Sequence, residues 1–326
     1  MLSYQGKFRA RKPVILPLSG VFLALSCAAT SPEHGSCSPS TEIVQVAAGI
    51  YVRPGHAAVV FEGDDIANLS VIVGDRCVAV IDTGSSAAEG RALSCAIRGV
   101  TDRPVCYVIN THVHPDHMLG NAAFAKPGVE FVGHAKLPRA LALRGDLYLE
   151  RASAHGGHEL DASHIVFPER TVTGTVELDI GGRILTVRAH NSAHTDHDLS
   201  VLDSTSNTAF VGDLVFLEHL PVIDGSINGW IDALEELSGE SIDYIVPGHG
   251  PPRAPWPAAA APTLEYLTEL RDKVRSWTSS GGDLASAQAN IDLSQRAEWL
   301  LVDRYHQRNV GAAFQELEWE DWTNDD

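Results

Sequence analysis

The sequence has no excess of basic residues, no Cys-x-x-Cys pair and no apolar run long enough for a comfortable membrane span. Its 24 Lys and Arg stand against 42 Asp and Glu, a formal net charge of -18. Nucleic-acid binding needs cationic side chains to replace phosphate counterions, so this balance argues against a nucleic-acid partner. The spacing of the five cysteines likewise argues against a zinc finger or a redox motif.

The first thirty residues differ in kind from the rest. A basic stretch, Lys7–Lys12, precedes the apolar run Val14–Leu25 and then small residues. This order predicts a signal peptide at residues 1–29 and a periplasmic or secreted protein. A bilayer span needs about 20 apolar residues, so we expect no stable membrane span after processing. A lipoprotein acylated at Cys27 is the alternative.

The remainder predicts a flexible leader at residues 30–41 and one folded domain at 42–326. Hydrophobic residues make up 44% of the chain, as in ordinary globular proteins. In an oxidising compartment four cysteines could pair, and the sequence does not choose the pairing: Cys37, Cys77, Cys95 and Cys106.

Short β-branched runs alternate with turns and helical stretches in two halves of similar order. This pattern predicts an α/β protein, an αββα sandwich of two mixed β-sheets flanked by helices. The expected strands are 43–46, 50–52, 57–61, 69–73, 77–81, 105–109, 129–132, 172–178, 184–187, 199–202, 208–211 and 242–246. The expected helices are 85–98, one from about 119, 135–151, 228–237 and two or three between 258 and 318. Residues 152–168, with His155 and His158, predict a long loop, either a lid that meets substrate or an exposed polar segment.

The densest chemical signal is the segment Thr111–His117, with three histidines and an aspartate directly after a buried strand. Imidazole and carboxylate are preferred zinc ligands, and alternate residues of an extended segment point the same way. His112 and His114 can therefore share one ion. Asp116 and His117 begin the next helix and can face a second ion.

Three further residues lie near the carboxyl ends of apolar strands, where α/β proteins build their sites. His194 would complete a three-histidine site with His112 and His114. Asp213 could bridge both ions, and His249 lies between glycines that allow close backbone approach. We therefore expect these residues to converge on the histidine-rich segment.

The chain resembles the metallo-β-lactamase superfamily in its HxHxDH segment, in Asp82, in His194, in Gly212-Asp213 and in Pro247–Gly250. The resemblance implies the αββα fold, usually two zinc ions, and hydrolysis by a metal-bound hydroxide. It implies that His112, His114 and His194 bind one metal, that Asp116, His117 and His249 bind the other, and that Asp213 bridges them. Asp82 would orient the loop that carries the ligands.

A narrower resemblance covers most of the mature chain. It rests on 111–121 with Phe124, 193–199, 212–216, 224–226, Trp230 and 305–318, which look like the quinoprotein relay zinc metallohydrolases. Those are exported proteins linked to periplasmic quinoprotein dehydrogenases, so the resemblance implies such a quinoprotein as a partner beside a small-molecule substrate.

The resulting expectation is an exported zinc-dependent metallohydrolase that acts on an ester, thioester, lactone or amide, with Asp116 as the catalytic acid. Several alternatives stay open: a β-lactamase, a glyoxalase II-like thioesterase, a mononuclear iron persulfide oxygenase, or a non-catalytic zinc-binding accessory protein. Against a cysteine-type lactamase, Asp213 and Phe216 stand where that subclass has its Cys and Lys.

The remaining candidates have ordinary structural explanations. His197 and Asp198 are close enough to His194 to support a ligand, but a turn explains them better. Phe216 and Trp230 fit an aromatic core better than a pocket lining. Five other histidines lack ligand spacing and are expected in core or surface roles: His134, His164, His190, His219 and His306.

Overall fold

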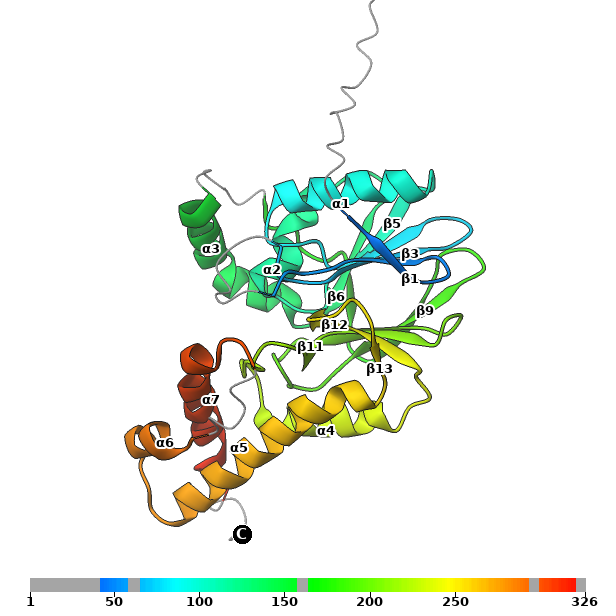
Figure 1. Cartoon of the computed structure of the whole chain (residues 1–326). Coiled ribbons are helices and arrows are strands. Elements are labelled where there is room, and N and C mark those ends of the chain that lie inside the picture. Colours follow the sequence, from blue (N-terminus) through cyan, green and yellow to red (C-terminus); the bar gives the residue numbers. More distant parts are fainter. Residues whose placement is uncertain (1–41, 58–64, 157–163, 293–298, 321–326) are drawn as a thin grey trace, which may run out of the picture. The chain divides into compact units, whose positions relative to one another are not determined.

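Two mixed β-sheets pack face to face and carry helices on both outer sides (Figure 1). The computed structural model describes residues 42–57, 65–156, 164–292 and 299–320. The predicted αββα class is confirmed. The predicted signal peptide and leader, residues 1–41, lie outside the described residues.

The first sheet contains seven strands in chain order. Antiparallel pairing joins the first four strands, and parallel pairing joins the last four. The inner strands are almost continuous runs of β-branched residues because both of their faces are covered. The strands are β1 (Val44–Ala47), β2 (Ile50–Arg53), β3 (Leu69–Val73), β4 (Val78–Ile81), β5 (Val105–Ile109), β6 (Glu130–His134) and β7 (Arg170–Val172).

The second sheet contains six strands in the order β13-β12-β11-β10-β9-β8. Its central strand, β11, is buried along all nine residues and pairs in parallel with β12. The other pairs are antiparallel. The strands are β8 (Thr175–Asp179), β9 (Ile184–Ala189), β10 (Leu199–Asp203), β11 (Thr208–Phe216), β12 (Tyr244–His249) and β13 (Ala254–Pro255).

Helices cover the outer faces with apolar stripes, and some of them begin at polar caps. In α1 (Ala87–Val100) the Ser86 hydroxyl accepts a hydrogen bond from the Glu89 N–H. In α4 (Ile227–Ser238) the Ser226 hydroxyl has the same role, and Trp230 packs inward. The other helices are α2 (Pro115–Met118), η1 (Leu119–Ala123), α3 (Leu137–Gly156), η3 (Ala258–Ala260), α5 (Ala261–Ser279), α6 (Leu284–Asn290) and α7 (Val302–Leu317).

Three apolar layers hold these elements together. The layer between the sheets includes Ile72, Ile109, Val187 and Val201, all fully buried. Further layers lie between the first sheet and α1, and between the second sheet and α4, α5, α6 and α7. Each fully buried aliphatic side chain contributes about 1.5–3 kcal/mol. The central layer fixes the sheets relative to each other, and with them the strand ends that carry the candidate ligands.

The structure corrects several predicted elements. The predicted strand 172–178 is two strands, because the chain leaves the first sheet after Val172 and enters the second at Thr175. The predicted loop 152–168 is helical up to Gly156, and 157–163, with His158, lie outside the described residues. The helix expected from 119 is a short α-turn followed by a 3-10 turn. Most of the expected strand 57–61 lies outside the described residues.

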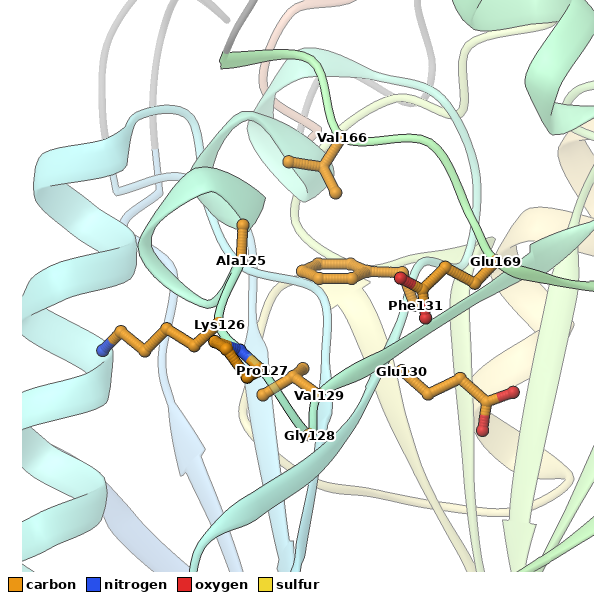
Figure 2. A pocket seen from close by; sticks show the side chains of 9 residues that line it. All are labelled: Ala125, Lys126, Pro127, Gly128, Val129, Glu130, Phe131, Val166 and Glu169. Atoms are coloured by element: carbon orange, nitrogen blue, oxygen red, sulfur yellow. The ribbon is translucent and has the colours of Figure 1, made fainter.

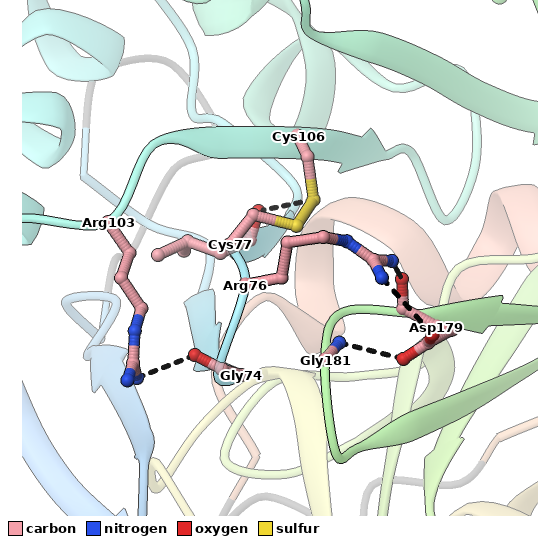
Figure 3. The surroundings of a disulfide bond; sticks show 8 residues. Gly74, Arg76, Cys77, Arg103, Cys106, Asp179 and Gly181 are labelled. Atoms are coloured by element: carbon pink, nitrogen blue, oxygen red, sulfur yellow. Dashed lines mark hydrogen bonds and ion pairs between the residues drawn. A yellow bond between two sulfur atoms is a disulfide. The ribbon is translucent and has the colours of Figure 1, made fainter.

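A disulfide joins Cys77, just before β4, to Cys106 in β5. Figure 3 shows it between the two parallel strands, with Arg103 donating to the Gly74 carbonyl beside it at 2.7 Å. Cys95 is also disulfide-bonded. The disulfide therefore ties together the two strands whose far ends lead to Asp82 and to the histidine-rich segment.

Among the described residues, no helix has the length and the apolar character needed to cross a membrane.

Candidate metal centre

The structure brings all seven predicted ligands together at the carboxyl ends of the strands. One set of donor atoms within 4.8 Å of one another comes from His112, His114, His194 and Asp213. A second set, within the same limit, comes from Asp116, His117 and His249. These two groups are called the first group and the second group below.

Asp82 organises the segment that carries four of these residues. It follows β4 in a left-handed conformation, with φ of 59°. Its buried carboxylate accepts hydrogen bonds from the Thr111 N–H at 2.8 Å and from the Thr111 hydroxyl at 2.7 Å. It also contacts His117 Nδ1 at 2.8 Å. Asp82 thus fixes both the start of the segment and the orientation of one ligand ring, as the resemblance implied.

Backbone carbonyls orient two further rings. His194 Nδ1 lies 2.7 Å from the Val222 carbonyl oxygen, and His249 Nδ1 lies 3.0 Å from the Ile66 carbonyl oxygen. Such an acceptor holds the proton on Nδ1, so Nε2 carries the lone pair that a metal needs. The two rings therefore present Nε2 to the centre.

His114 is turned the other way. Its Nε2 lies 3.1 Å from Asp224 Oδ2, and its Nδ1 lies 3.0 Å from His112 Nε2 and 3.2 Å from His194 Nε2. Three nitrogens that crowd together in this way can each bind the same cation. The contact with Asp224 leaves His114 Nδ1 as the inward donor.

Asp213 lies between the two groups. One carboxylate oxygen is 3.2 Å from His117 Nε2, and the other is 3.4 Å from His249 Nε2 and 3.5 Å from His194 Nε2. Contrary to the prediction, Asp213 lies inside β11 and not after it. The register with β12 shifts on both sides of Gly212, and this bulge turns the side chain toward the centre.

Gly248 lets the two strands approach at this point. A Cβ atom there would lie 1.9 Å from Asp213 Oδ1, so a larger residue would displace the carboxylate. Pairing of β11 with β12 therefore requires glycine beside Asp213.

The protonation states of the residues in the centre depend on burial and on one another. Burial lowers the pKa of His194 to about 3 and that of His112 well below its usual value, so both rings are neutral, as ligands must be. Burial opposes ionisation of Asp116 and Asp213, but neighbouring histidines outweigh it. His117, with His249, lowers the pKa of Asp116 to about 2, and His249, with His117, lowers that of Asp213. Both carboxylates stay charged.

The second group has the charge pattern of a cation site. Burial opposes protonation of His117 and His249, yet Asp213 and Asp116 raise the pKa of both rings above the usual value. Within the described residues, His117 Nε2 and Asp213 Oδ1 lie 3.2 Å apart, and neither buried atom makes a well-formed hydrogen bond. Two inward donor atoms in a negative pocket fit a divalent metal ion.

Aromatic side chains form the wall behind the ligands. Phe216 stacks on the His249 ring at 5.4 Å between centroids, and Trp230 contacts the His194 ring at 5.2 Å. Both are buried, as the prediction of an aromatic core requires. His219 also packs on His249, at 5.6 Å. This wall restricts the rings to their inward orientation.

The other predicted candidates have structural roles. His197 Nδ1 lies 2.8 Å from the Thr195 hydroxyl, and Asp198 accepts from the Thr195 N–H at 2.8 Å, so both support the turn after His194. His190 contacts the Ser200 hydroxyl, and His306 contacts Tyr266. Within the described residues, none of these histidines belongs to a group of three or more potential ligands.

Three residues near the centre were not identified as functional from the sequence. Asn68 donates to the Pro247 and Gly250 carbonyls on either side of His249, at 2.9 and 3.2 Å. Asp224 contacts His114, and Arg144 pairs with Asp224. Asp224 belongs to the segment 224–226 of the narrower resemblance, but its role depends on its contact with His114, which is 110 residues away in the chain. Asn68 and Arg144 have no local sequence signal.

The structure also contains a separate hollow of about 540 Å³. Figure 2 shows it around the ring of Phe131, with Val166 on one side and Lys126 on the loop before β6. None of its lining residues belongs to the two groups of donors.

An αββα sandwich with two clusters of His and Asp donors at its strand ends defines a class of metal-binding proteins, usually hydrolases. The chain belongs to the metallo-beta-lactamase superfamily, whose family model matches residues 63–249. The match includes all seven candidate ligands.

Solved structures show the same fold. A metallo-beta-lactamase from Pontibacter korlensis is 20% identical, with a TM-score of 0.58 over 70% of this chain and 98% of that one. The inverting sec-alkylsulfatase Pisa1 from Pseudomonas sp. is 16% identical, with a TM-score of 0.66 over 84% of this chain. The match covers 50% of the alkylsulfatase. A linear primary-alkylsulfatase from Pseudomonas sp. is 38% identical over 45 residues, which are 14% of this chain and 8% of that protein.

Proposed function

We propose that this chain is an exported dinuclear zinc hydrolase that cleaves an ester, thioester, lactone or amide bond. The observation that carries the proposal is the convergence of seven donors into two groups that share Asp213. His112, His114 and His194 would hold one ion, and Asp116, His117 and His249 the other. Two closed structural zinc sites would take eight protein ligands, whereas this centre has seven donor residues, and catalytic zinc can expand to five ligands, which leaves room for water.

Two bound zinc ions would lower the pKa of water toward about 7 and would polarise the substrate oxygen. The chain supplies the rest of the chemistry. Buried Phe216 and Trp230 exclude water from behind the ligands. Asp82 and the Val222 carbonyl keep His117 and His194 in the tautomer that faces the centre.

Asp116 is the residue that we assign to proton transfer. Its side chain is 16% exposed, while the His117 and His249 side chains beside it are almost fully buried. With a pKa of about 2 it is ionised at neutral pH, as a ligand must be, and its partly exposed carboxylate is the group placed to relay a proton to the leaving group.

The test is a hydrolysis panel of a thioester, a lactone and a β-lactam with the zinc-loaded protein and an Asp116→Ala variant. Loss of Asp116 removes both the proton-transfer group and a metal ligand, and it should lower kcat by at least about 10²-fold. Asp196→Ala is the matched control, because this aspartate is 53% exposed and belongs to neither group of donors. Full zinc occupancy without turnover on any substrate would instead support an accessory protein, and iron with oxygen uptake would support an oxygenase.

Export and a quinoprotein partner are the finer parts of the proposal. Disulfides persist in oxidising compartments, and the Cys77–Cys106 bond therefore supports export. Cell fractionation with amino-terminal sequencing of the mature protein tests this point, since export predicts cleavage near residue 29. The quinoprotein link rests on the sequence resemblance. Purification of this protein from a host that expresses a periplasmic quinoprotein dehydrogenase tests it, since the link predicts that the dehydrogenase co-purifies.

Sulfate-ester hydrolysis is a second candidate, favoured by the 45-residue match to a primary alkylsulfatase. An alkyl sulfate in the same panel distinguishes the two reactions. Released inorganic sulfate, with no turnover of carbonyl substrates, would replace the first candidate by the second.

A further inference from the structure

Two arginines from opposite sides of the sandwich meet at Asp224. Arg144 of α3 pairs with Asp224 Oδ2, and Arg308 Nη2 of α7 lies 3.7 Å from Asp224 Oδ1. Asp224 Oδ2 also contacts His114 Nε2 at 3.1 Å. The two guanidinium groups are therefore one residue away from a candidate ligand of the first group.

This edge is where the centre is accessible. The side chains of His112, His117, His194 and His249 are at most 1% exposed, whereas those of His114 and Asp116 are 20% and 16% exposed. Arg144 and Arg308 are more open still, at 37% and 56%. A molecule bound against the exposed part of His114 would therefore lie beside the two arginines.

Positive side chains gather at this edge. Two guanidinium groups share the Asp224 carboxylate, in a chain whose formal net charge is -18, and the other ionised carboxylate exposed beside the centre is that of Asp116. Each guanidinium has five N–H donors in a planar fork, and the Asp224 carboxylate, with the Tyr148 hydroxyl beside Arg144, cannot accept them all. Carboxylate and sulfate oxygens match that fork geometry.

We propose that Arg144 and Arg308 form an anion subsite beside the first group of ligands, which binds a carboxylate or sulfate carried by the substrate next to its scissile bond. This proposal rests on the proposed hydrolase function and names a substrate class for it. Asp224 holds the two arginines together and keeps His114 Nδ1 inward, so it links the subsite to the centre.

The test compares two esters with the zinc-loaded protein, 4-nitrophenyl hydrogen succinate, which carries a carboxylate, and 4-nitrophenyl pentanoate, which is neutral. Arg308→Gln is expected to raise the KM of the anionic ester about tenfold and to leave that of the neutral ester within twofold. Arg308→Lys keeps the charge and should restore the KM to within about threefold. Arg139→Gln, at an exposed arginine on the same helix as Arg144, is the control for net charge.

A binding measurement separates this proposal from the reaction. Calorimetric titration with succinate and with inorganic sulfate should show about tenfold weaker binding of the preferred anion to Arg308→Gln, with unchanged zinc content. The tighter of the two anions identifies the group that the subsite prefers. Arg144→Gln should act in the same direction, and zinc analysis will show whether His114 still binds.

The outcomes are distinct. If neither ester is cleaved but Arg308→Gln still weakens anion binding, the carbonyl hydrolase fails and the subsite stands. If both esters are cleaved and Arg308→Gln affects them equally or not at all, the subsite is overturned and the hydrolase stands.

Discussion

The two sheets deliver their ligands to the centre in different ways. The first sheet contributes four, all from the seven-residue segment after β5. The second sheet contributes three, one each from the loop after β9, the bulge in β11 and the end of β12. One hydrogen-bonding residue can orient several ligands on the same short segment, whereas ligands on separate loops each need a partner of their own. Asp82 orients the segment of the first sheet, and backbone carbonyls orient the His194 and His249 rings of the second sheet.

The largest effect expected on the first side is loss of the Cys77–Cys106 disulfide. The bond closes a loop with a sequence separation of 29, so a Cys77→Ala, Cys106→Ala double variant should lose about 3–4 kcal/mol of unfolding free energy. Urea denaturation measures the change. A loss below about 1 kcal/mol would show that β4 and β5 are held by their apolar contacts alone.

Asp82→Asn should follow, with a fall of about 100-fold in zinc affinity, the upper end of the range for residues that orient ligands. The amide can still accept from the Thr111 N–H, but its NH₂ replaces the oxygen that faces the Thr111 hydroxyl and His117 Nδ1. Competition with a chromophoric chelator measures the affinity. Asp203→Asn, at a buried aspartate paired with Arg183, is the control and should leave zinc affinity within twofold.

The next prediction concerns His190, a buried histidine that follows β9 of the second sheet and is not a candidate ligand. Burial lowers its pKa to about 4, so the folded state binds the proton less tightly than the unfolded chain does. Its contribution to stability is complete above about pH 6.5 and is lost as the pH falls toward 4. Between pH 7 and pH 5 the wild type should lose about 2 kcal/mol more than His190→Gln. Equal losses in urea denaturation at the two pH values would contradict a neutral buried ring.

The smallest effect on zinc affinity is expected from single substitutions of the two asparagines that hold the backbone near His249 and near Val222. Asn68→Ala frees the carbonyls around His249 and should lower affinity for one zinc ion about tenfold. Asn309→Ala, which frees the Pro221 carbonyl and the Ile223 N–H beside Val222, should act through His194 on the other ion. If both variants weaken the binding of the same zinc ion in the chelator competition, the two metal sites are not supported independently.

This difference between the sides also explains what the sequence predicts. The HxHxDH segment identifies four candidate ligands because their geometry is local. The predicted strands were also needed to identify His194, Asp213 and His249 as candidates. Each of these residues lies at or near the end of a predicted apolar strand. The bulge that places Asp213 inside β11 depends on the register with β12, which no local pattern contains.

The residues that support the ligands were harder to predict. Asn68 contacts a carbonyl 179 residues away, and Arg144 reaches Asp224 across 80 residues. Such contacts exist only after both sheets have packed. The split of residues 172–178 into strands of different sheets was missed for the same reason, since either sheet could accommodate the β-branched run.

The central claim is that the two groups of donors hold two metal ions that share Asp213. Elemental analysis of the purified mature protein, beside an Asp116→Ala, His249→Ala double variant, tests it most directly. We expect close to two zinc ions per chain, falling to about one in the variant with loss of turnover. A single metal ion in the wild type, or a variant that keeps both, would contradict it.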